Sequence, residues 1–203
     1  MLKHIYLNFD KNVKNSFQWI KAINSLVAMD SSQLTNEQIY FAYEYAFLKV
    51  FVGWERFTQD SFVAYITGRR IKGHCYRTYL KNVTETHALE LLSGRSPYPD
   101  WTQFEDIYRL AKLFFVNHEA FTLPFKEIEA IFIEIKKIRN AIVHMSFLAN
   151  EKFRGLLRNN LTSYNIDMIP GEFLSKQKTR KKTFIEYYVS YLETAASKII
   201  PLH

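Results

Sequence analysis

Hydrophobic residues recur along most of this chain at spacings of three and four, which is the period of an amphipathic helix. The first such stripe predicts a helix that begins at Asp10 as N-cap and ends near Asp30. Its inward-facing residues are Val13, Phe17, Ile20, Ile23 and Val27. We therefore expect an amphipathic helix near the start of the chain.

The most apolar segment follows and predicts a long buried helix. Thr35 and Gln38 have the spacing of a capping box, and Gly68 is a plausible C-terminal stop. Within this helix the longest apolar tract, residues 39–54, is interrupted by charges and is shorter than the roughly 20 residues that a bilayer span needs. We expect a central helix of the fold, and no membrane span.

The rest of the chain repeats the helical pattern. Asp100 is placed to cap one helix, and Thr122 with Pro124 is placed to open another that continues to about Met145. Further helices are predicted over residues 86–92 (closing at Gly94), 150–161 and 183–199. The pattern predicts one all-α domain over residues 1–203, a bundle of five to seven helices with two long antiparallel helices at its centre.

Composition agrees with a packed helical protein. Of 203 residues, 48% are hydrophobic and only six are Gly and five Pro, which is not the composition of a disordered chain. Cys75 is the only cysteine, so no intrachain disulfide is possible. The amino terminus also lacks the pattern of an export signal. We therefore expect a cytoplasmic protein.

The net charge of +7 favours a polyanionic partner. Two basic runs, residues 69–81 and 176–182, contain no acidic residue. Each run alone is as well explained by a solvated loop as by phosphate contact. The candidate RNA-binding residues in these runs are Arg69, Arg70, Lys72, Arg77, Lys178, Arg180, Lys181 and Lys182.

The candidate chemistry lies in "KKIRNAIVHM", residues 136–145, where an apolar helical stripe gives way to Arg139, Asn140 and His144. Asn140 and His144 are four apart and share a helical face, whereas Arg139 and His144 are about 140° apart on an ideal helix. We therefore expect that Arg139 and His144 do not converge within one chain. A two-fold axis would bring Arg139 of one copy to His144 of the other, which predicts a homodimer.

Such a composite site suits RNA cleavage. Imidazole is the side chain whose ordinary pKa lies nearest neutrality, so His144 fits a general acid or base that acts on the ribose 2′-OH or the leaving oxygen. Arg139 supplies fixed charge and planar donors for the phosphate oxygens, and Asn140 would orient the phosphate or the imidazole. The alternative is that these residues are a solvated helix end without chemistry.

The stretch "RNAIVH" resembles the Arg-x4-6-His signature of the HEPN superfamily, in the form with Asn after Arg. "FVGWERFTQDSFVAYITG", with Trp54, Glu55 and Phe57, is similar to the second helix of HEPN proteins from bacterial defence and toxin loci. "IPGEFL" before the last helix is similar too. The resemblance covers about residues 35–200, and only the Arg-Asn-His cluster is sharply diagnostic.

The resemblance implies a metal-independent endoribonuclease without cofactors that acts as a homodimer, with Arg139 and His144 as catalytic pair and Asn140 beside them. Glu55 matches an acidic residue that some members keep near the site. A toxin or phage-defence role, and a neutralising antitoxin, are implied as well. Ser146 departs from toxins that have a modified Tyr at this place, so nucleotide attachment there is not expected.

Other classes remain open. One is a non-catalytic HEPN module for RNA binding, dimerisation or partner binding, and another is a helical antitoxin or immunity protein. A metal site of His74, Cys75, His87 and His118 matches no standard zinc spacing. The aromatic residues at 40–51 follow the helical period of a core and are not expected to stack on bases.

Overall fold

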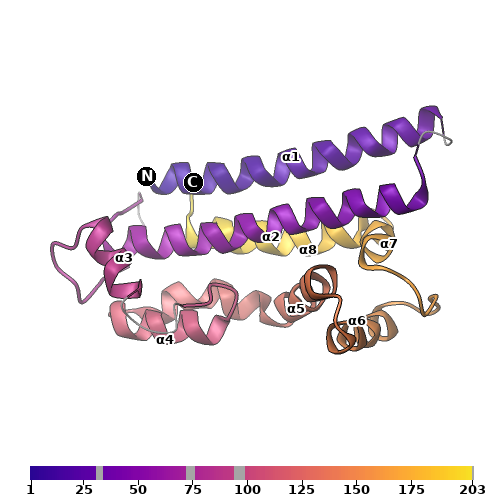
Figure 1. Cartoon of the computed structure of the whole chain (residues 1–203). Coiled ribbons are helices and arrows are strands. Elements are labelled where there is room, and N and C mark those ends of the chain that lie inside the picture. The colour runs from indigo at the N-terminus through magenta and orange to yellow at the C-terminus, as the bar shows by residue number, and fades with distance from the viewer. Residues whose placement is uncertain (31–33, 72–75, 94–98, 203) are drawn as a thin grey trace. The chain divides into compact units, whose positions relative to one another are not determined.

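The computed structural model describes residues 1–30, 34–71, 76–93 and 99–202, which are helical over most of their length (Figure 1). The all-α prediction is confirmed, with eight helices in these residues, one more than the upper limit we predicted. The helices are α1 Leu2–Met29, α2 Asn36–Ile66, α3 Glu85–Ser93, α4 Phe104–Phe114, α5 His118–His144, α6 Phe147–Asn160, α7 Pro170–Ser175 and α8 Phe184–Ile199. One antiparallel pair of short strands, β1 Gln177–Thr179 and β2 Lys182–Thr183, lies between α7 and α8.

The chain forms two compact units, and each long helix contributes to both. Unit 1 comprises Met1–Asp10, Gly53–Glu129 and Leu192–His203. Unit 2 comprises Lys11–Val52 and Ala130–Tyr191. Each unit is described by itself below.

Unit 1 has an aromatic core between the second half of α2 and the first half of α5. The rings of Trp54 and Phe125 are 6.0 Å apart, and those of Phe62 and Phe121 are 5.5 Å apart. Because the numbers rise on α2 as they fall on α5, the two helices are antiparallel here. The expected pair of long antiparallel helices is thus present, at 31 and 27 residues. Tyr65 closes this core by donating a hydrogen bond to the carbonyl oxygen of Ile199, at 2.7 Å.

Unit 2 begins with α1 packed antiparallel against the first half of α2. The Asn12 amide donates to the Lys49 carbonyl oxygen at 2.9 Å, and the Asn24 amide donates to the Tyr43 hydroxyl at 3.0 Å. On the other side of α2, the Glu44 carboxylate accepts a hydrogen bond from the Gly171 backbone N–H of α7, also at 2.9 Å. These polar contacts fix α1 and α7 against the first half of α2, whose other buried residues are hydrophobic.

Local signals set both ends of α2, as predicted. The backbone N–H of Thr35 donates to the Gln38 side chain, and the Gln38 N–H donates to the Thr35 hydroxyl, which is a reciprocal capping box. At the other end Gly68 has φ +77°, a conformation that glycine adopts without strain. The N–H groups of Gly68 and Arg69 bond back to Tyr65 and Ala64, so the helix ends in a Schellman motif.

Three predicted helix starts are wrong. Helix α1 begins at Leu2, not at Asp10, because Leu2, Ile5 and Phe9 continue its buried stripe backwards. Helix α4 begins at Phe104, since the Asp100 carboxylate accepts from the backbone N–H and the hydroxyl of Thr102 in a turn before the helix.

The third wrong start is that of α5, which begins at His118. Thr122 and Pro124 lie inside this helix, and the Thr122 hydroxyl donates to the Glu119 carbonyl oxygen instead of capping it. Phe121 and Phe125 are fully buried. Their packing extends the helix toward its start and outweighs the backbone hydrogen bond that Pro124 removes.

Candidate active site

Helix α5 carries the candidate site on its last two turns. This end of the helix belongs to unit 2, and its residues Ile135, Ile138 and Ala141 are buried. Arg139 and Asn140 are half-buried, and His144, the last helical residue, is exposed. The apolar stripe therefore fixes the backbone, while the polar side chains face the surface where a substrate has access.

Arg139 and His144 converge within one chain, contrary to our expectation. Arg139 Nη1 lies 3.0 Å from His144 Nε2 and 3.0 Å from Asn140 Oδ1. The predicted angle of about 140° describes where the side chains leave the helix and ignores how far they reach. Five residues span only about 7.5 Å of helix axis, which the long arginine side chain bridges. The spacing of the motif therefore does not by itself require a dimer.

The guanidinium of Arg139 also lies on an aromatic support. Its central carbon is 5.7 Å from the centre of the Phe51 ring, within the range of a cation–π interaction. Phe51 in turn stacks on Phe132, with ring centres 6.0 Å apart and planes 16° from parallel. Sequence reasoning missed Phe51, because a buried helix rich in aromatic residues gives no signal for which ring meets the arginine.

The contact between Arg139 and His144 needs an acceptor nitrogen on the imidazole. A guanidinium has only N–H donors, so His144 Nε2 must be the acceptor. The tautomer that allows this contact carries its proton on Nδ1. Protonation of Nε2 would break this contact. A stronger acceptor that binds the Arg139 guanidinium would also break it.

A sharp turn places His144 at the helix end. Met145 has φ +46°, a left-handed conformation that ends α5. Ser146 then caps α6, since its hydroxyl accepts from the Ala149 backbone N–H at 3.3 Å. Because two helix ends meet at this turn, the backbone on both sides of His144 is anchored.

Glu55 belongs to unit 1, whereas Arg139, Asn140 and His144 belong to unit 2. The catalytic role of Glu55 therefore stays a prediction. Some residues that entered the predictions from sequence lie outside the described part of the chain. They are Lys72, His74, Cys75 and Gly94.

The two basic runs also fall in different units. Arg69, Arg70 and Arg77 are exposed in unit 1. In unit 2, Arg180, Lys181 and Lys182 are exposed on the turn and second strand of the β1–β2 hairpin. Their exposure leaves both groups accessible to phosphate, and their role in RNA binding stays a prediction.

Lys178 differs from its basic neighbours, because its ammonium group is already engaged. Its Nζ donates to Asn160 Oδ1 at 2.7 Å and lies 5.1 Å and 5.5 Å from the ring centres of Phe184 and Tyr187. These contacts attach the hairpin to α6 and α8. Lys178 therefore has a structural role, and its role in RNA binding stays a prediction.

The described part of the chain contains no group of three or more His, Cys, Asp and Glu residues that could hold a metal ion. The suggested zinc set is not assembled there, since His74 and Cys75 lie outside it. None of the described helices is both long and apolar enough to cross a membrane.

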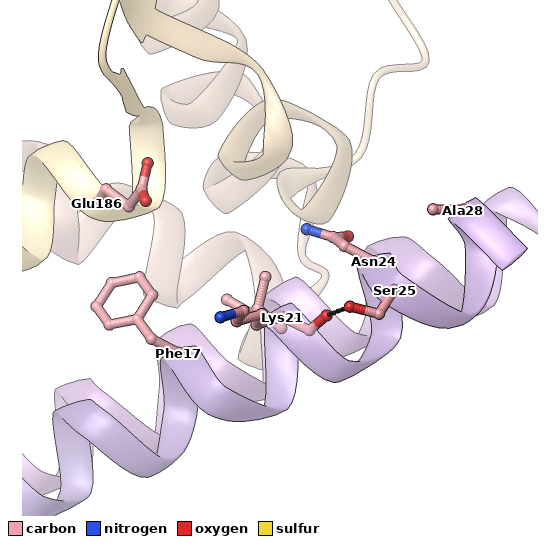
Figure 2. A pocket seen from close by; sticks show the side chains of 7 residues that line it. Phe17, Lys21, Asn24, Ser25, Ala28 and Glu186 are labelled. Carbon is pink, nitrogen blue, oxygen red and sulfur yellow. Dashed lines mark hydrogen bonds between the residues drawn. The ribbon is translucent and has the colours of Figure 1, made fainter.

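A separate hollow of about 480 Å³ lies in unit 2 along one face of α1, next to Glu186 of α8 (Figure 2). Its polar groups are mostly engaged within the protein: the Ser25 hydroxyl donates to the Lys21 carbonyl oxygen, and the Asn24 amide donates to Tyr43. Glu186 accepts hydrogen bonds from the backbone N–H and hydroxyl of Thr183. The hollow thus offers few free groups for chemistry.

No protein-family model, curated protein or solved structure matches this chain in the three comparisons made with known proteins. The function is therefore inferred from the residues of the candidate site.

Proposed function

We propose that this protein is a metal-independent endoribonuclease of the HEPN type that acts as a toxin or phage-defence effector. The observation that carries the proposal is the triad at the end of α5, where Arg139 Nη1 is 3.0 Å from both Asn140 Oδ1 and His144 Nε2. This cluster combines an imidazole, a fixed positive charge and an amide on an exposed helix end. These are the groups that metal-free cleavage of RNA requires.

The proposed reaction is an internal transesterification. His144 takes the proton from a ribose 2′-OH, the 2′-oxygen attacks the adjacent phosphorus, and the bond from phosphorus to the 5′-oxygen breaks. The leaving 5′-oxygen takes up a proton from solvent water, and the protonated His144 returns its proton to the solvent. The products are a 2′,3′-cyclic phosphate and a 5′-hydroxyl end, so no water molecule acts as the nucleophile in the bond-breaking step.

Substrate binding would exchange the partner of Arg139. Without substrate, the guanidinium engages Nε2, the lone pair that a general base needs. A phosphate oxygen is the stronger acceptor for a guanidinium, because the bond joins two opposite charges. Arg139 would therefore move to the phosphate and release Nε2 for the 2′-OH, while Phe51 holds the guanidinium near its place. Catalysis then begins only when phosphate is bound.

A homodimer remains part of the proposal, now on different grounds. Large apolar side chains next to His144 in the sequence are exposed, with Phe147 at 80% and Met145 at 72%. We call this set the His144 patch, which consists of Val143, Met145, Phe147 and Leu148. Exposed apolar patches of this kind mark interaction surfaces. A second copy packed on the His144 patch would bring two candidate sites together.

RNA would be held by exposed basic residues in both units. Arg180, Lys181 and Lys182 in unit 2, and Arg69, Arg70 and Arg77 in unit 1, are the proposed phosphate contacts. Such contacts supply affinity without reading sequence. The choice of target bases would therefore come from other contacts.

A second candidate function is a non-catalytic HEPN module, favoured by the engagement of Nε2 with Arg139 in the free protein. Induction in bacteria separates the two. The nuclease should arrest growth, and His144→Ala or Arg139→Ala should relieve the arrest, whereas His87→Ala, at an exposed histidine of unit 1, should not. Arrest that persists equally in both site variants would support the non-catalytic module. Relief by a co-expressed neighbouring gene product would identify an antitoxin.

A further inference from the structure

Unit 1 contains a pocket of about 240 Å³ that the proposed nuclease mechanism does not use. One face of α4 and one face of α5 form its walls. The lining residues are Tyr108, Lys112, His118, Glu119, Thr122 and Lys126. Tyr108 and Lys112 are one turn apart on α4, and the α5 residues follow at steps of about one turn. The pocket is thus built by side chains that the helical repeat holds on facing surfaces.

The residues that line this pocket carry more positive than negative charge. Lys112 and Lys126 contribute two ammonium groups, and Glu119 contributes one carboxylate. Within the described residues neither lysine forms an ion pair. The two lysines outnumber the single carboxylate among the lining residues, and Glu105 and Glu129, which act on Tyr108 from outside the lining, reduce this excess without joining it.

Tyr108 adds geometry to this charge. The Lys126 ammonium nitrogen lies 5.8 Å from the centre of the Tyr108 ring, so the ring positions the amine at the pocket wall. The Tyr108 hydroxyl is buried and has no hydrogen-bond partner in the described part of the chain. Burial, followed by the charges of Glu129 and Glu105, raises the pKa of this hydroxyl. It therefore keeps its proton at neutral pH and remains a donor without an acceptor.

We propose that this pocket binds the phosphate group of a small phosphate monoester, such as a nucleoside monophosphate. A phosphate monoester carries nearly two negative charges at neutral pH and three acceptor oxygens. The two lysines match its charge, and His118 with the lysines supplies donors for its oxygens. The two lysines together outweigh Glu119, and because the net attraction grows with the charge of the ligand, a doubly charged phosphate is favoured over a singly charged anion. The ligand class follows from this balance.

The test is titration of the purified protein with inorganic phosphate, a nucleoside 5′-monophosphate and the matching nucleoside, at constant ionic strength. Calorimetry gives the affinity, and the ring-proton NMR signal of His118, assigned by its loss in His118→Gln, locates the site. Both phosphates should bind and shift this signal, whereas the nucleoside should do neither. Lys112→Gln and Lys126→Gln should each weaken binding by about tenfold or more, while the corresponding Arg variants should retain it.

Lys3→Gln, at an exposed lysine of unit 1, is the matched control and should leave the affinity unchanged. Circular dichroism would show whether each variant is folded. An unmoved His118 signal on addition of phosphate would overturn the proposal. Equal weakening by Lys3→Gln would also overturn it, because binding would then depend on overall charge and not on the pocket.

Discussion

At the residue scale, Glu44 is a carboxylate buried against α7. It is only 7% exposed, and it accepts a hydrogen bond from the Gly171 backbone N–H at 2.9 Å. Burial raises the pKa of Glu44, and the hydrogen bond from Gly171 lowers it by less. The folded protein therefore binds this proton more tightly than the unfolded chain does. The contribution of Glu44 to stability is fully present below the ordinary glutamate pKa and is lost as the pH rises through the raised one.

We predict that Glu44→Gln stabilises the protein at neutral pH. The glutamine oxygen can still accept from Gly171, and no buried charge forms. The measurement is the free energy of unfolding in urea, for wild type and variant, at pH about 7 and about 4. The advantage of the variant should be larger at the higher pH. A variant that is less stable than wild type at neutral pH would show that the ionised carboxylate is a net stabilising group.

The distance between the Arg139 and His144 side chains could not be predicted from their spacing in the sequence. The helical angle between their Cα–Cβ bonds was known from the sequence, but the conformation of the arginine side chain was not. The guanidinium of Arg139 lies against the ring of Phe51. Phe51 is 88 positions earlier in the chain. Convergence of the pair therefore depends on a tertiary contact that no local pattern contains.

At the element scale, the close approach of α7 to α2 depends on Gly171. A Cβ atom at this position would lie 2.1 Å from the Tyr40 carbonyl oxygen and 2.6 Å from its carbon. Both are backbone atoms that cannot rotate away. We predict that Gly171→Ala lowers the free energy of unfolding by roughly 3 kcal/mol or more, measured by urea denaturation.

Gly155, inside α6, is the matched control for this prediction. A Cβ atom there would meet nothing within 4 Å. Gly155→Ala should therefore raise stability by roughly 0.5–1 kcal/mol, because alanine favours the helix interior. If both alanine variants changed stability equally, the close approach of the two helices would not be the cause.

The helices that sequence predicted well are those with strong local signals at their ends. Thr35 with Gln38 and Gly68 set the limits of α2 through hydrogen bonds to nearby backbone groups. Asp10 and Thr122 carry equally good local signals and yet lie inside helices. At both positions the burial of neighbouring apolar side chains extends the helix beyond the predicted N-cap residue. A capping rule considers only nearby residues and does not include this burial energy.

At the scale of the whole molecule, the proposed homodimer makes a prediction of its own. Phe147→Glu would place a charge in the centre of the His144 patch and should convert a dimer into a monomer in sedimentation experiments. Ile166→Glu, at an apolar residue of unit 2 that is also well exposed, should not change the assembly. A wild-type protein that remains monomeric at high concentration would contradict the proposed dimer.

The arrangement of the chain into two units was not predicted. The helical period identifies which face of each helix is buried, but it does not divide one continuous helix between two cores. Four long helices do this, with α5 changing unit between Glu129 and Ala130. The sequence motif therefore located the candidate site on α5 without revealing that Glu55, on α2, belongs to the other unit.

The central claim is that His144 and Arg139 cleave RNA without a metal ion. The direct measurement is cleavage of single-stranded RNA by the purified protein in excess EDTA, with identification of the product ends. We predict 2′,3′-cyclic phosphate and 5′-hydroxyl ends, loss of roughly 10²–10⁴-fold in rate for His144→Ala, and an unchanged rate for His87→Ala. Cleavage that needs a divalent metal, or that survives His144→Ala, would contradict the account.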